Sequence, residues 1–590
     1  MAVITPSGAS PRDPSGRGTS ATTDSRGAGP VPTDTGAGGS NSRASASGQA
    51  SASRSRRLAR GAGVPLGPDD AALAIPTPAR PLLPLWLAVL AAAAGGAIID
   101  AGSPDKLWWP VAFVGIGLVL WALIGQRTGR AFVLGLIAGF SFWGVHIFWL
   151  TLYLGPVPWL ALAGLQSIFF GLGAMLIAVV YRLAPKVWPT RAGRIGLVPV
   201  VIAGLWVLRE SISAVWPEGG FSWGKVAFTQ SEGPLAPLVA WVGFAGLSFI
   251  MVWLVAFAIQ LVRESTLPAL RRLLLGTTAV VAILAMPAWP APTDGTTRIA
   301  AVQGNSDAGL FSARAFGDIL NDHISETLPL VGQKVDMVVW PENASDIDPT
   351  RYPQAARALD YLSKAMNAPF VVGTITQTDA GEYFNSSLLW KAGQGATDTY
   401  DKRHPVPFAE YMPARPLFRV LVPDLVDLVT RDYGKGTTDT VFDINGVIAG
   451  ISICFDITDD SVMREMMGEG AQVILAQTNN ADFGRTNENL QQLSIARLRA
   501  IETGRSLVNI STVGNSAIIG PDGKTIIAIA PYQAGSMVAD VPLATVNTPA
   551  TLFGQGLELL IGGLGLAGLT IAVAYRRPAG TTKKKRPARS

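Results

Sequence analysis

Three reactive side chains each follow a short apolar run that is typical of a buried strand. Glu342 follows the run 335–340, Cys454 follows the run 447–453, and Lys402 follows a third strand-like run. A carboxylate can remove the proton of a thiol, and the thiolate can then attack an acyl carbon. An ammonium, together with backbone N–H groups, can stabilise the oxyanion that forms. These side chains therefore provide the groups that acyl transfer through a thioester requires.

Cys454 is the only cysteine among 590 residues. Residues 458–461 behind it predict the start of a helix, whose N–H groups would favour the thiolate. Taken alone, a single cysteine is more often a small core residue, and a single Glu or Lys in a loop is more often a solvated charge. The combination of all three favours the catalytic interpretation.

The count of metal-ligating residues argues against a metal site. One cysteine excludes an intrachain disulfide and a cysteine-based metal cluster. The histidines, His146, His323 and His404, are widely spaced along the chain, which disfavours a histidine-rich site. We therefore expect neither a metal ion nor any other cofactor.

The region 297–546 has the composition of an ordinary globular domain. Strand-like apolar runs alternate in it with helical stretches such as 352–366 and 489–502. This alternation is typical of an α/β sheet, in which functional groups collect where the strands end. We therefore expect 297–546 to be the catalytic domain.

The rest of the chain has the composition of a membrane protein. Only 15% of all residues are charged, the mean hydropathy is +0.32, and there are 16 Trp. About 20 apolar residues suffice for a helix to cross the hydrocarbon core. Eight segments predict transmembrane helices, seven within 81–290 and one within 553–576. They are roughly 82–99, 108–124, 131–154, 157–181, 195–209, 235–262, 272–288 and 556–575.

Loop charges predict the orientation of these helices. Lys and Arg are concentrated in every second loop, and the positive-inside rule makes such loops cytoplasmic. Both termini are then cytoplasmic, and 297–546 is extracytoplasmic. The Gly-, Ser- and Ala-rich residues 1–80 predict a disordered tail, and 577–590 form a basic tail. The net charge of +5 lies mostly in these tails, which indicates anionic lipid headgroups rather than nucleic acid as the contact.

Several motifs in a fixed order resemble a known superfamily. They are Trp340-Pro341-Glu342, the run Lys402-x-His-x-Val-Pro-Phe-x-Glu-Tyr411, and Ile453-Cys454-Phe455. In this order they resemble the nitrilase, or carbon–nitrogen hydrolase, superfamily. A domain inserted before the last of eight helices is similar to its membrane branch, the bacterial apolipoprotein N-acyltransferases. The high Ala, Gly and Arg content and the long N-terminal tail suggest an actinobacterial source.

The resemblance implies a fold and a set of roles. The fold would be a polytopic helical membrane bundle that carries an αββα sandwich. Glu342 would be the general base, Lys402 the oxyanion stabiliser and Cys454 the nucleophile. Glu410 would position the lysine, and the backbone N–H of Phe455 would complete the oxyanion hole.

The resemblance also implies a ping-pong reaction at the cell membrane. The cysteine would take an acyl chain from a membrane phospholipid and release a lysophospholipid. The N-terminal α-amine of an S-diacylglyceryl-cysteine apolipoprotein would then attack the thioester, which is the last step of lipoprotein maturation. Because both substrates are lipids held in the bilayer, many transmembrane helices would be expected.

The chain departs from the family pattern near the site. Asp456 stands where the family usually has Glu, and Asp482 stands where the family usually has Trp, before Phe483. We expect a changed lipid preference rather than loss of activity. Candidate substrate contacts are Trp223, Tyr411 and Phe483, and the apolar stretch 411–433 is a candidate lid that meets lipid.

Two alternatives stay open from the sequence. A membrane-anchored amidase or nitrilase would use the same three side chains with water as second substrate, although a single anchoring helix would suffice for it. A transporter or binding protein whose outer domain has lost catalysis would require an inert Cys454, and the presence of the base and the lysine argues against it. Two membrane features are likewise open, because His146 could be functional or simply hydrogen-bonded. Arg209 and Glu210 could bind a phosphate headgroup or pair with each other.

Overall fold

The computed structural model describes residues 80–106, 108–309 and 314–575. The two tails predicted at 1–80 and 577–590 lie outside the described residues, apart from Arg80. Each of the eight predicted apolar segments overlaps with a helix. The helices of this part of the chain are α1 (Leu85–Ala101), α2 (Val111–Leu123), α3 (Thr128–His146), α4 (Leu150–Leu154), α5 (Pro156–Val187), η2 (Gly193–Leu197), α6 (Val198–Val215), η3 (Ser222–Gly224), η4 (Val226–Gln230), η5 (Ala236–Leu238), α7 (Val239–Arg263), α8 (Ala269–Leu284) and α15 (Pro549–Ala574).

Five helical stretches are long and apolar enough to cross a membrane. They are Thr128–His146, Pro156–Val187, Gly193–Val215, Ala236–Arg263 and Pro549–Ala574. The apolar helices α1 and α2 are shorter, and the predicted segment 131–154 is divided between α3 and α4. Length and composition therefore support several membrane helices, whereas the number eight stays a prediction.

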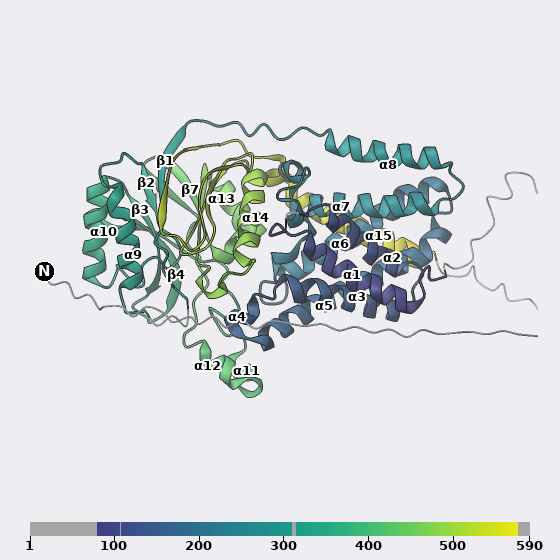
Figure 1. The fold of residues 1–590 in the computed structure, drawn as a ribbon, viewed down its shortest axis with the longest axis horizontal. Helices are drawn as coiled ribbons and strands as arrows, with labels where there is room; N and C mark the ends of the chain where they lie inside the picture. The colour runs from purple at the N-terminus through teal and green to yellow at the C-terminus, as the bar shows by residue number, and fades with distance from the viewer. Residues whose placement is uncertain (1–79, 107, 310–313, 576–590) are drawn as a thin grey trace, which may run out of the picture. The chain divides into compact units, whose positions relative to one another are not determined.

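Small residues let the helices of the bundle approach closely, as is common between membrane helices. A Cβ atom on Gly96 in α1 would lie 2.1 Å from the carbonyl oxygen of Ala138 in α3. A Cβ atom on Gly204 in α6 would lie 2.7 Å from the carbonyl oxygen of Ile561 in α15. Helix α15 follows the α/β domain in sequence, so the chain leaves the bundle, forms that domain and then returns to the bundle (Figure 1).

The α/β domain contains two mixed six-stranded sheets. Their strand orders are β12-β1-β2-β3-β4-β5 and β11-β10-β9-β8-β7-β6. The pairs β1–β2, β2–β3, β7–β8 and β8–β9 are parallel. The strands are β1 (Thr296–Gln303), β2 (Met337–Val339), β3 (Phe370–Gln377), β4 (Tyr383–Lys391), β5 (Gly395–Asp401), β6 (Val441–Ile444), β7 (Val447–Ile453), β8 (Val473–Thr478), β9 (Ser506–Ser511), β10 (Ser516–Ile519), β11 (Thr525–Ile529) and β12 (Gly535–Pro542).

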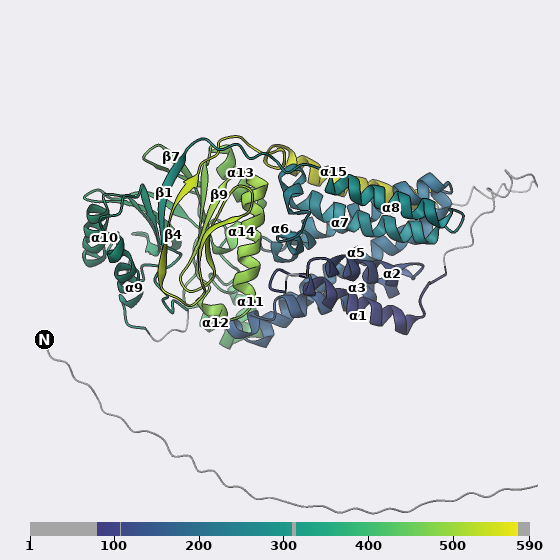
Figure 2. The ribbon, with the colours of Figure 1, turned by 45° about the horizontal axis from the view of Figure 1, so that its top comes forward.

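Helices cover the outer faces of both sheets (Figures 1 and 2). Helices α9 and α10 lie on the first sheet, and α13 and α14 lie on the second. Buried side chains of the two inner faces, such as Val339 and Ile451, form one core between the sheets. The predicted αββα layering is therefore present. The helices of this domain are α9 (Asp318–Thr327), η6 (Leu328–Leu330), α10 (Pro353–Met366), α11 (Arg415–Leu421), α12 (Pro423–Leu428), η7 (Cys454–Thr458), α13 (Asp460–Gly468), η8 (Ala481–Phe483) and α14 (Glu488–Thr503).

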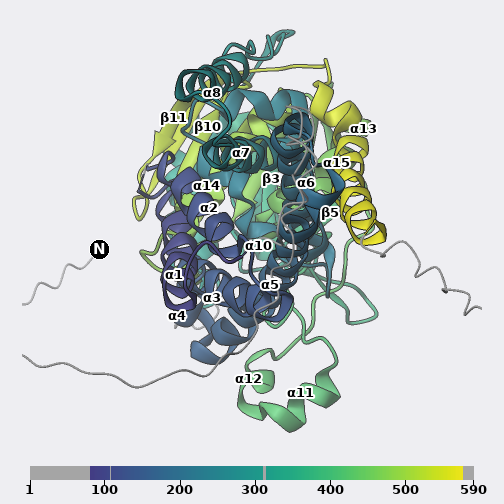
Figure 3. The ribbon, with the colours of Figure 1, turned by 90° about the vertical axis from the view of Figure 1, so that its right-hand side faces the viewer.

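The bundle and the helical layer on the second sheet share one hydrophobic core. Met463 of α13 and Ile495 of α14 belong to the same buried cluster as Trp223 and Phe244 from the bundle side. Helices α11 and α12, by contrast, project away from both sheets (Figure 3). The structure thus joins the domain to the bundle on the side of α13 and α14, directly behind the strand that leads to Cys454.

Candidate active site

The strand ends bring the three predicted reactive side chains to one place. Glu342 lies just after β2, Lys402 just after β5 and Cys454 just after β7, so both sheets contribute. Lys402 Nζ lies 3.6 Å from Glu342 Oε1, and both side chains act electrostatically on the thiol of Cys454. The geometry fits the predicted set, and the catalytic role of each member stays a prediction.

Lys402 is held rigidly between two carboxylates. Its side chain is buried, and Nζ lies 2.8 Å from Glu410 Oε2 in addition to its contact with Glu342. Its backbone N–H donates to the carbonyl of Asn385 at 2.9 Å. Burial by itself lowers the pKa of Lys402, but the charges of Glu410 and Glu342 raise it well above its ordinary value. Lys402 is therefore an ammonium over the whole physiological range.

Asn385 on β4 connects the two carboxylates and was not predicted from the sequence. Its Nδ2 donates to Glu342 Oε1 at 2.7 Å and to Glu410 Oε1 at 2.8 Å. Burial raises the pKa of Glu342, Lys402 opposes this increase, and the charge of Glu410 adds to it. A carboxylate with a raised pKa is a stronger base near neutral pH. The site therefore suits Glu342 to accept a proton.

The backbone at Cys454 is strained, and the surroundings of its thiol raise the thiol pKa. The φ angle of Cys454 is +49°, a left-handed value that side-chain-bearing residues rarely adopt. The residue is half-buried. Burial raises the pKa of the thiol well above its ordinary value, Glu342 raises it further, and Lys402 lowers it. Burial and the nearby carboxylate therefore outweigh the lysine and the helix N-terminus, the two features that favour the thiolate.

Asp456 links the cysteine turn to the lysine loop. It is buried in η7, and its carboxylate accepts hydrogen bonds from Tyr400 Oη at 2.8 Å and from the His404 N–H at 3.0 Å. Both donors flank Lys402 in sequence. Although its side chain is shorter than that of the Glu usual in the family, Asp456 thus connects the loop of Lys402 to the turn of Cys454.

Aromatic rings line the bundle side of the cysteine turn. The ring of Phe455 stacks on Phe221 and Trp223, with centroids 5.9 and 6.2 Å apart and interplanar angles of 11° and 6°. Trp223 Nε1 donates to Gln491 Oε1 of α14 at 2.7 Å. The predicted contact residue Trp223 is therefore fixed beside the residue that follows the cysteine. Gln491 was not predicted, because nothing in its sequence neighbourhood indicates this contact.

The two other candidate substrate contacts occupy different surroundings. Phe483 packs edge-on against Trp149 and Tyr153, with ring centroids 5.0 and 5.5 Å apart. It therefore belongs to the aromatic surface that continues from Trp223, since the Trp149 and Trp223 rings lie 5.8 Å apart. Tyr411 is half-exposed, and its hydroxyl donates to Glu218 Oε2 at 3.3 Å.

The two ambiguous membrane features have partners within the bundle. The Nδ1 atom of His146 lies 2.9 Å from Asp100 Oδ1. Arg209 Nη2 donates to Glu210 Oε1 at 3.3 Å, and Trp206 Nε1 donates to the same oxygen at 2.8 Å. These contacts favour the interpretation in which the polar groups satisfy one another.

The layered fold and the site define a class of protein. A strained cysteine beside a buried glutamate and lysine, at the strand ends of an αββα sandwich, is the arrangement expected of the carbon–nitrogen hydrolase class. The family described as "Carbon-nitrogen hydrolase" matches residues 298–549. The family described as "Apolipoprotein N-acyltransferase N-terminal domain" matches residues 95–257.

Curated relatives narrow this class to one family. The apolipoprotein N-acyltransferase of Mycolicibacterium smegmatis is 32% identical over 541 residues, which cover 84% of this chain and 88% of that protein. Its counterpart in Pseudomonas aeruginosa is 29% identical over 78% of this chain and 90% of that protein. The one in Shewanella oneidensis is 27% identical over 81% and 95%, respectively. The chain belongs to the apolipoprotein N-acyltransferase family, and its actinobacterial relative agrees with the predicted source.

Proposed function

We propose that this chain transfers an acyl chain from a membrane phospholipid, through a thioester on Cys454, to the N-terminal α-amine of S-diacylglyceryl-cysteine apolipoproteins. The observation that carries the proposal is the ammonium of Lys402, held 2.8 Å from Glu410 and 3.6 Å from Glu342 beside the single cysteine. Membership of the family supports the acceptor, and the apolar helices support a substrate that stays in the bilayer.

In the first half-reaction, Cys454 attacks the ester carbonyl of the phospholipid. As the C–S bond forms, the thiol proton passes to Glu342, because burial keeps the thiol protonated until a base removes the proton. The ammonium of Lys402 and the backbone N–H of Phe455 stabilise the oxyanion. When the intermediate collapses, the C–O bond breaks, and the leaving lysophospholipid oxygen takes the proton from Glu342. The product is an acyl thioester.

In the second half-reaction, the α-amine of the acceptor attacks the thioester. Glu342 receives a proton from the amine, and the same two donors stabilise the second oxyanion. Collapse breaks the C–S bond, and the sulfur of Cys454 regains the proton. Through their contacts, Glu410 and Asn385 keep the side chains of Lys402 and Glu342 in place during both steps.

The arrangement in the membrane follows from the same proposal. Eight helices would cross the cell membrane, with seven in 81–290 and the last in 553–576. Both termini would be cytoplasmic, and the catalytic domain, 297–546, would be extracytoplasmic. Trp223 and Phe483 would contact lipid in the site, as would Tyr411 at its exposed margin.

The two short helices α11 and α12 support a lid that meets lipid. They project from the domain (Figure 3) and expose large apolar side chains. Val420 and Leu421 are 81% and 64% exposed. Apolar side chains on a projecting segment are stable when they enter the lipid interface.

The test uses the full-length protein in detergent with a diacyl phospholipid and a synthetic S-diacylglyceryl-cysteine peptide. Mass spectrometry should detect the peptide with one added acyl chain at its α-amine, together with lysophospholipid. The variant Cys454→Ala should produce neither. Release of free fatty acid with an unmodified peptide would contradict the proposal and would indicate a hydrolase that uses water instead.

A further inference from the structure

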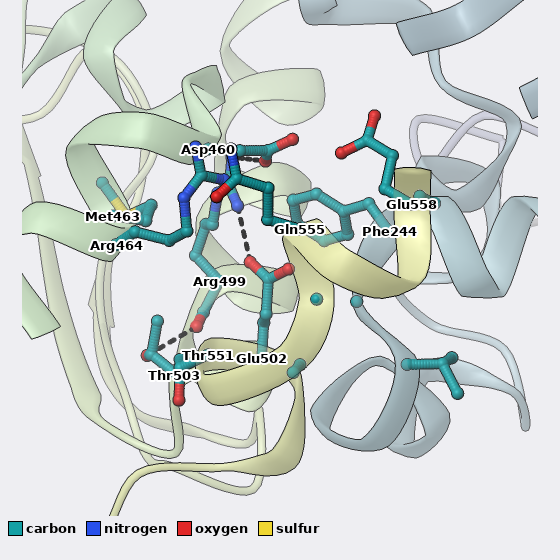
Figure 4. A pocket seen from close by; sticks show the side chains of 15 residues that line it. Phe244, Asp460, Met463, Arg464, Arg499, Glu502, Thr503, Thr551, Gln555 and Glu558 are labelled. Carbon is teal, nitrogen blue, oxygen red and sulfur yellow. Dashed lines mark hydrogen bonds and ion pairs between the residues drawn. The ribbon is translucent and has the colours of Figure 1, made fainter. Parts of the chain in front are cut away.

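A second group of buried charges lies behind the cysteine turn. We call Lys225, Asp460, Arg499 and Glu502 the charge latch. Lys225 Nζ lies 2.7 Å from Asp460 Oδ2, and Arg499 Nη2 lies 2.7 Å from Asp460 Oδ1. Arg499 Nη1 lies 2.5 Å from Glu502 Oε2. Figure 4 shows the Arg499 side chain reaching Asp460 on one side and Glu502 on the other.

The charge latch joins the membrane bundle to the catalytic domain. Lys225 belongs to the segment between α6 and α7, whereas the other three members lie on α13 and α14. Both cations lie near the ring of Phe244 in α7, with Arg499 Cζ 4.3 Å and Lys225 Nζ 5.6 Å from its centroid. A cation over an aromatic face is stabilised, especially where water is excluded. The bundle therefore supplies both a charge and an aromatic surface to the latch.

The charge latch also holds the end of the turn that begins at Cys454. Arg499 Nε donates to the carbonyl of Ile457 at 2.9 Å, and Arg499 Nη2 donates to the carbonyl of Thr458 at 3.0 Å. From the bundle side, Ser222 Oγ donates to the same Thr458 carbonyl at 3.1 Å. The carbonyls at the end of η7 are thus held by one residue of the domain and one of the bundle.

Such a restraint matters because Cys454 is strained. A residue with a positive φ persists in that conformation only when its surroundings determine it strongly. The turn from Cys454 to Thr458 is fixed on one side by Asp456 and on the other by Arg499 and Ser222. Displacing a catalytic group by about 1 Å can lower a rate by two orders of magnitude.

We propose that the charge latch positions the nucleophile, and that Lys225 is a positioning residue contributed by the membrane bundle. The latch keeps the turn in the conformation in which Cys454 and the N–H of Phe455 meet the substrate carbonyl. This inference rests on the proposed role of Cys454 as the nucleophile. It assigns the membrane bundle a part in the chemistry beyond holding lipid substrates.

A set of variants separates positioning from simple stability. Lys225→Met removes the charge but keeps an unbranched chain over Phe244, and Lys225→Arg keeps the charge. Gln555→Ala is the matched control, because Gln555 lines the same pocket as Asp460, Arg499 and Glu502 without belonging to the latch (Figure 4). Melting temperatures of all variants in detergent show whether each one folds.

The first readout is the rate of thioester formation in full-length protein, followed by intact mass over a range of phospholipid concentrations. We expect Lys225→Met to lower the rate at saturating phospholipid at least about tenfold, because the nucleophile is displaced. The phospholipid concentration that gives half the maximal rate should not change. Lys225→Arg should recover most of the rate, and Gln555→Ala should match the wild type.

The second readout is the rate at which iodoacetamide alkylates Cys454, which needs no lipid. We expect Lys225→Met to change this rate and Lys225→Arg to restore it. If folded Lys225→Met forms the thioester at the wild-type rate, the positioning role is wrong although the proposed function stands. If the wild type forms no thioester, the proposed function is wrong, and the alkylation rate alone then tests the positioning role of Lys225. An unchanged alkylation rate in Lys225→Met would then overturn the positioning role.

Discussion

Two groups of buried charges flank the same short segment, Cys454 to Asp460, and they are built differently. We call Glu342, Lys402 and Glu410 the front group; in it, the single cation Lys402 is shared by the two carboxylates. The charge latch is the rear group. It has two cations and two carboxylates, and Asp460 contacts both cations. The front group has one negative charge in excess, whereas the rear group is balanced.

The pKa values follow this difference. Burial raises the pKa of Glu342, and the shared lysine opposes this only in part. Burial also acts on Asp460, but its two cations lower the pKa of Asp460 below the ordinary value. Within the latch, the pKa of Glu502, which contacts one cation only, is raised by burial. The carboxylate that must accept a proton thus contacts one shared cation, whereas Asp460, which lies at the end of the turn, contacts two cations.

Removing the cation of the front group should have the largest effect. In Lys402→Met the oxyanion loses its ammonium, and two buried carboxylates lose their partner. We expect the rate of peptide N-acylation to fall by about 10³-fold, as is typical when an oxyanion-stabilising donor is lost. Lys225→Met in the latch should reduce the rate less. Equal losses in the two variants would contradict the distinction between a chemical group and a positioning group.

Asp456 connects the lysine loop to the cysteine turn, and its loss should have an intermediate effect. In Asp456→Asn, one oxygen becomes an NH₂ group, so either Tyr400 or the His404 N–H loses its acceptor. A buried donor without a partner destabilises by roughly 1–3 kcal/mol, and we expect a loss of about tenfold in the acylation rate. Asp522→Asn, in an exposed ion pair with Lys524, is the control. Wild-type activity in Asp456→Asn would show that the lysine loop needs no such link.

Glu488 should have the smallest effect, seen as a change in pH dependence. It is buried, accepts a hydrogen bond from Asn480 at 2.9 Å, and has its pKa raised by burial to about 8. Between the ordinary pKa of 4.5 and about 8, the folded protein keeps this proton, whereas the unfolded chain has lost it. Stability should therefore fall as pH rises across this interval.

Glu488→Gln removes this pH dependence, because the amide cannot ionise. We expect its melting temperature to exceed that of the wild type by several degrees at pH 8, because the raised pKa of Glu488 destabilises only the wild type there. Near pH 4.5 the difference should disappear. The exposed Glu382→Gln serves as the control. A parallel pH profile for Glu488→Gln and the wild type would show that Glu488 is ionised in the folded protein.

The proposed catalytic residues of the front group could be predicted from the sequence, whereas the ion pairs of the rear group could not. Glu342, Lys402 and Cys454 each end a strand-like run and stand in recognisable motifs, so local pattern was sufficient to identify them. Local pattern also predicted an α/β domain and the apolar helices, whereas the αββα layering was implied by the resemblance to the nitrilase superfamily. The raised pKa of the thiol could not be predicted, because burial depends on how the sheets and the bundle pack.

The charge latch depends on contacts between segments that are far apart in sequence. Lys225 is the single lysine between α6 and α7, and Arg499 lies on a helix with other arginines. The local sequence of neither position indicates its partner, because the pairing with Asp460 exists only once the bundle packs against α13 and α14. Asn385 is similar, since its two carboxylate partners come from loops that follow other strands.

The most direct test of the account is the intact mass of detergent-purified, full-length protein after incubation with a diacyl phospholipid. The wild type should gain the mass of one acyl chain, hydroxylamine should remove it, and Cys454→Ala should gain nothing. If Cys454→Ala gains the same mass, or if several phospholipids leave the wild type unmodified even at early times, Cys454 is not the acyl carrier. The assignment of the front group as catalytic would then be wrong.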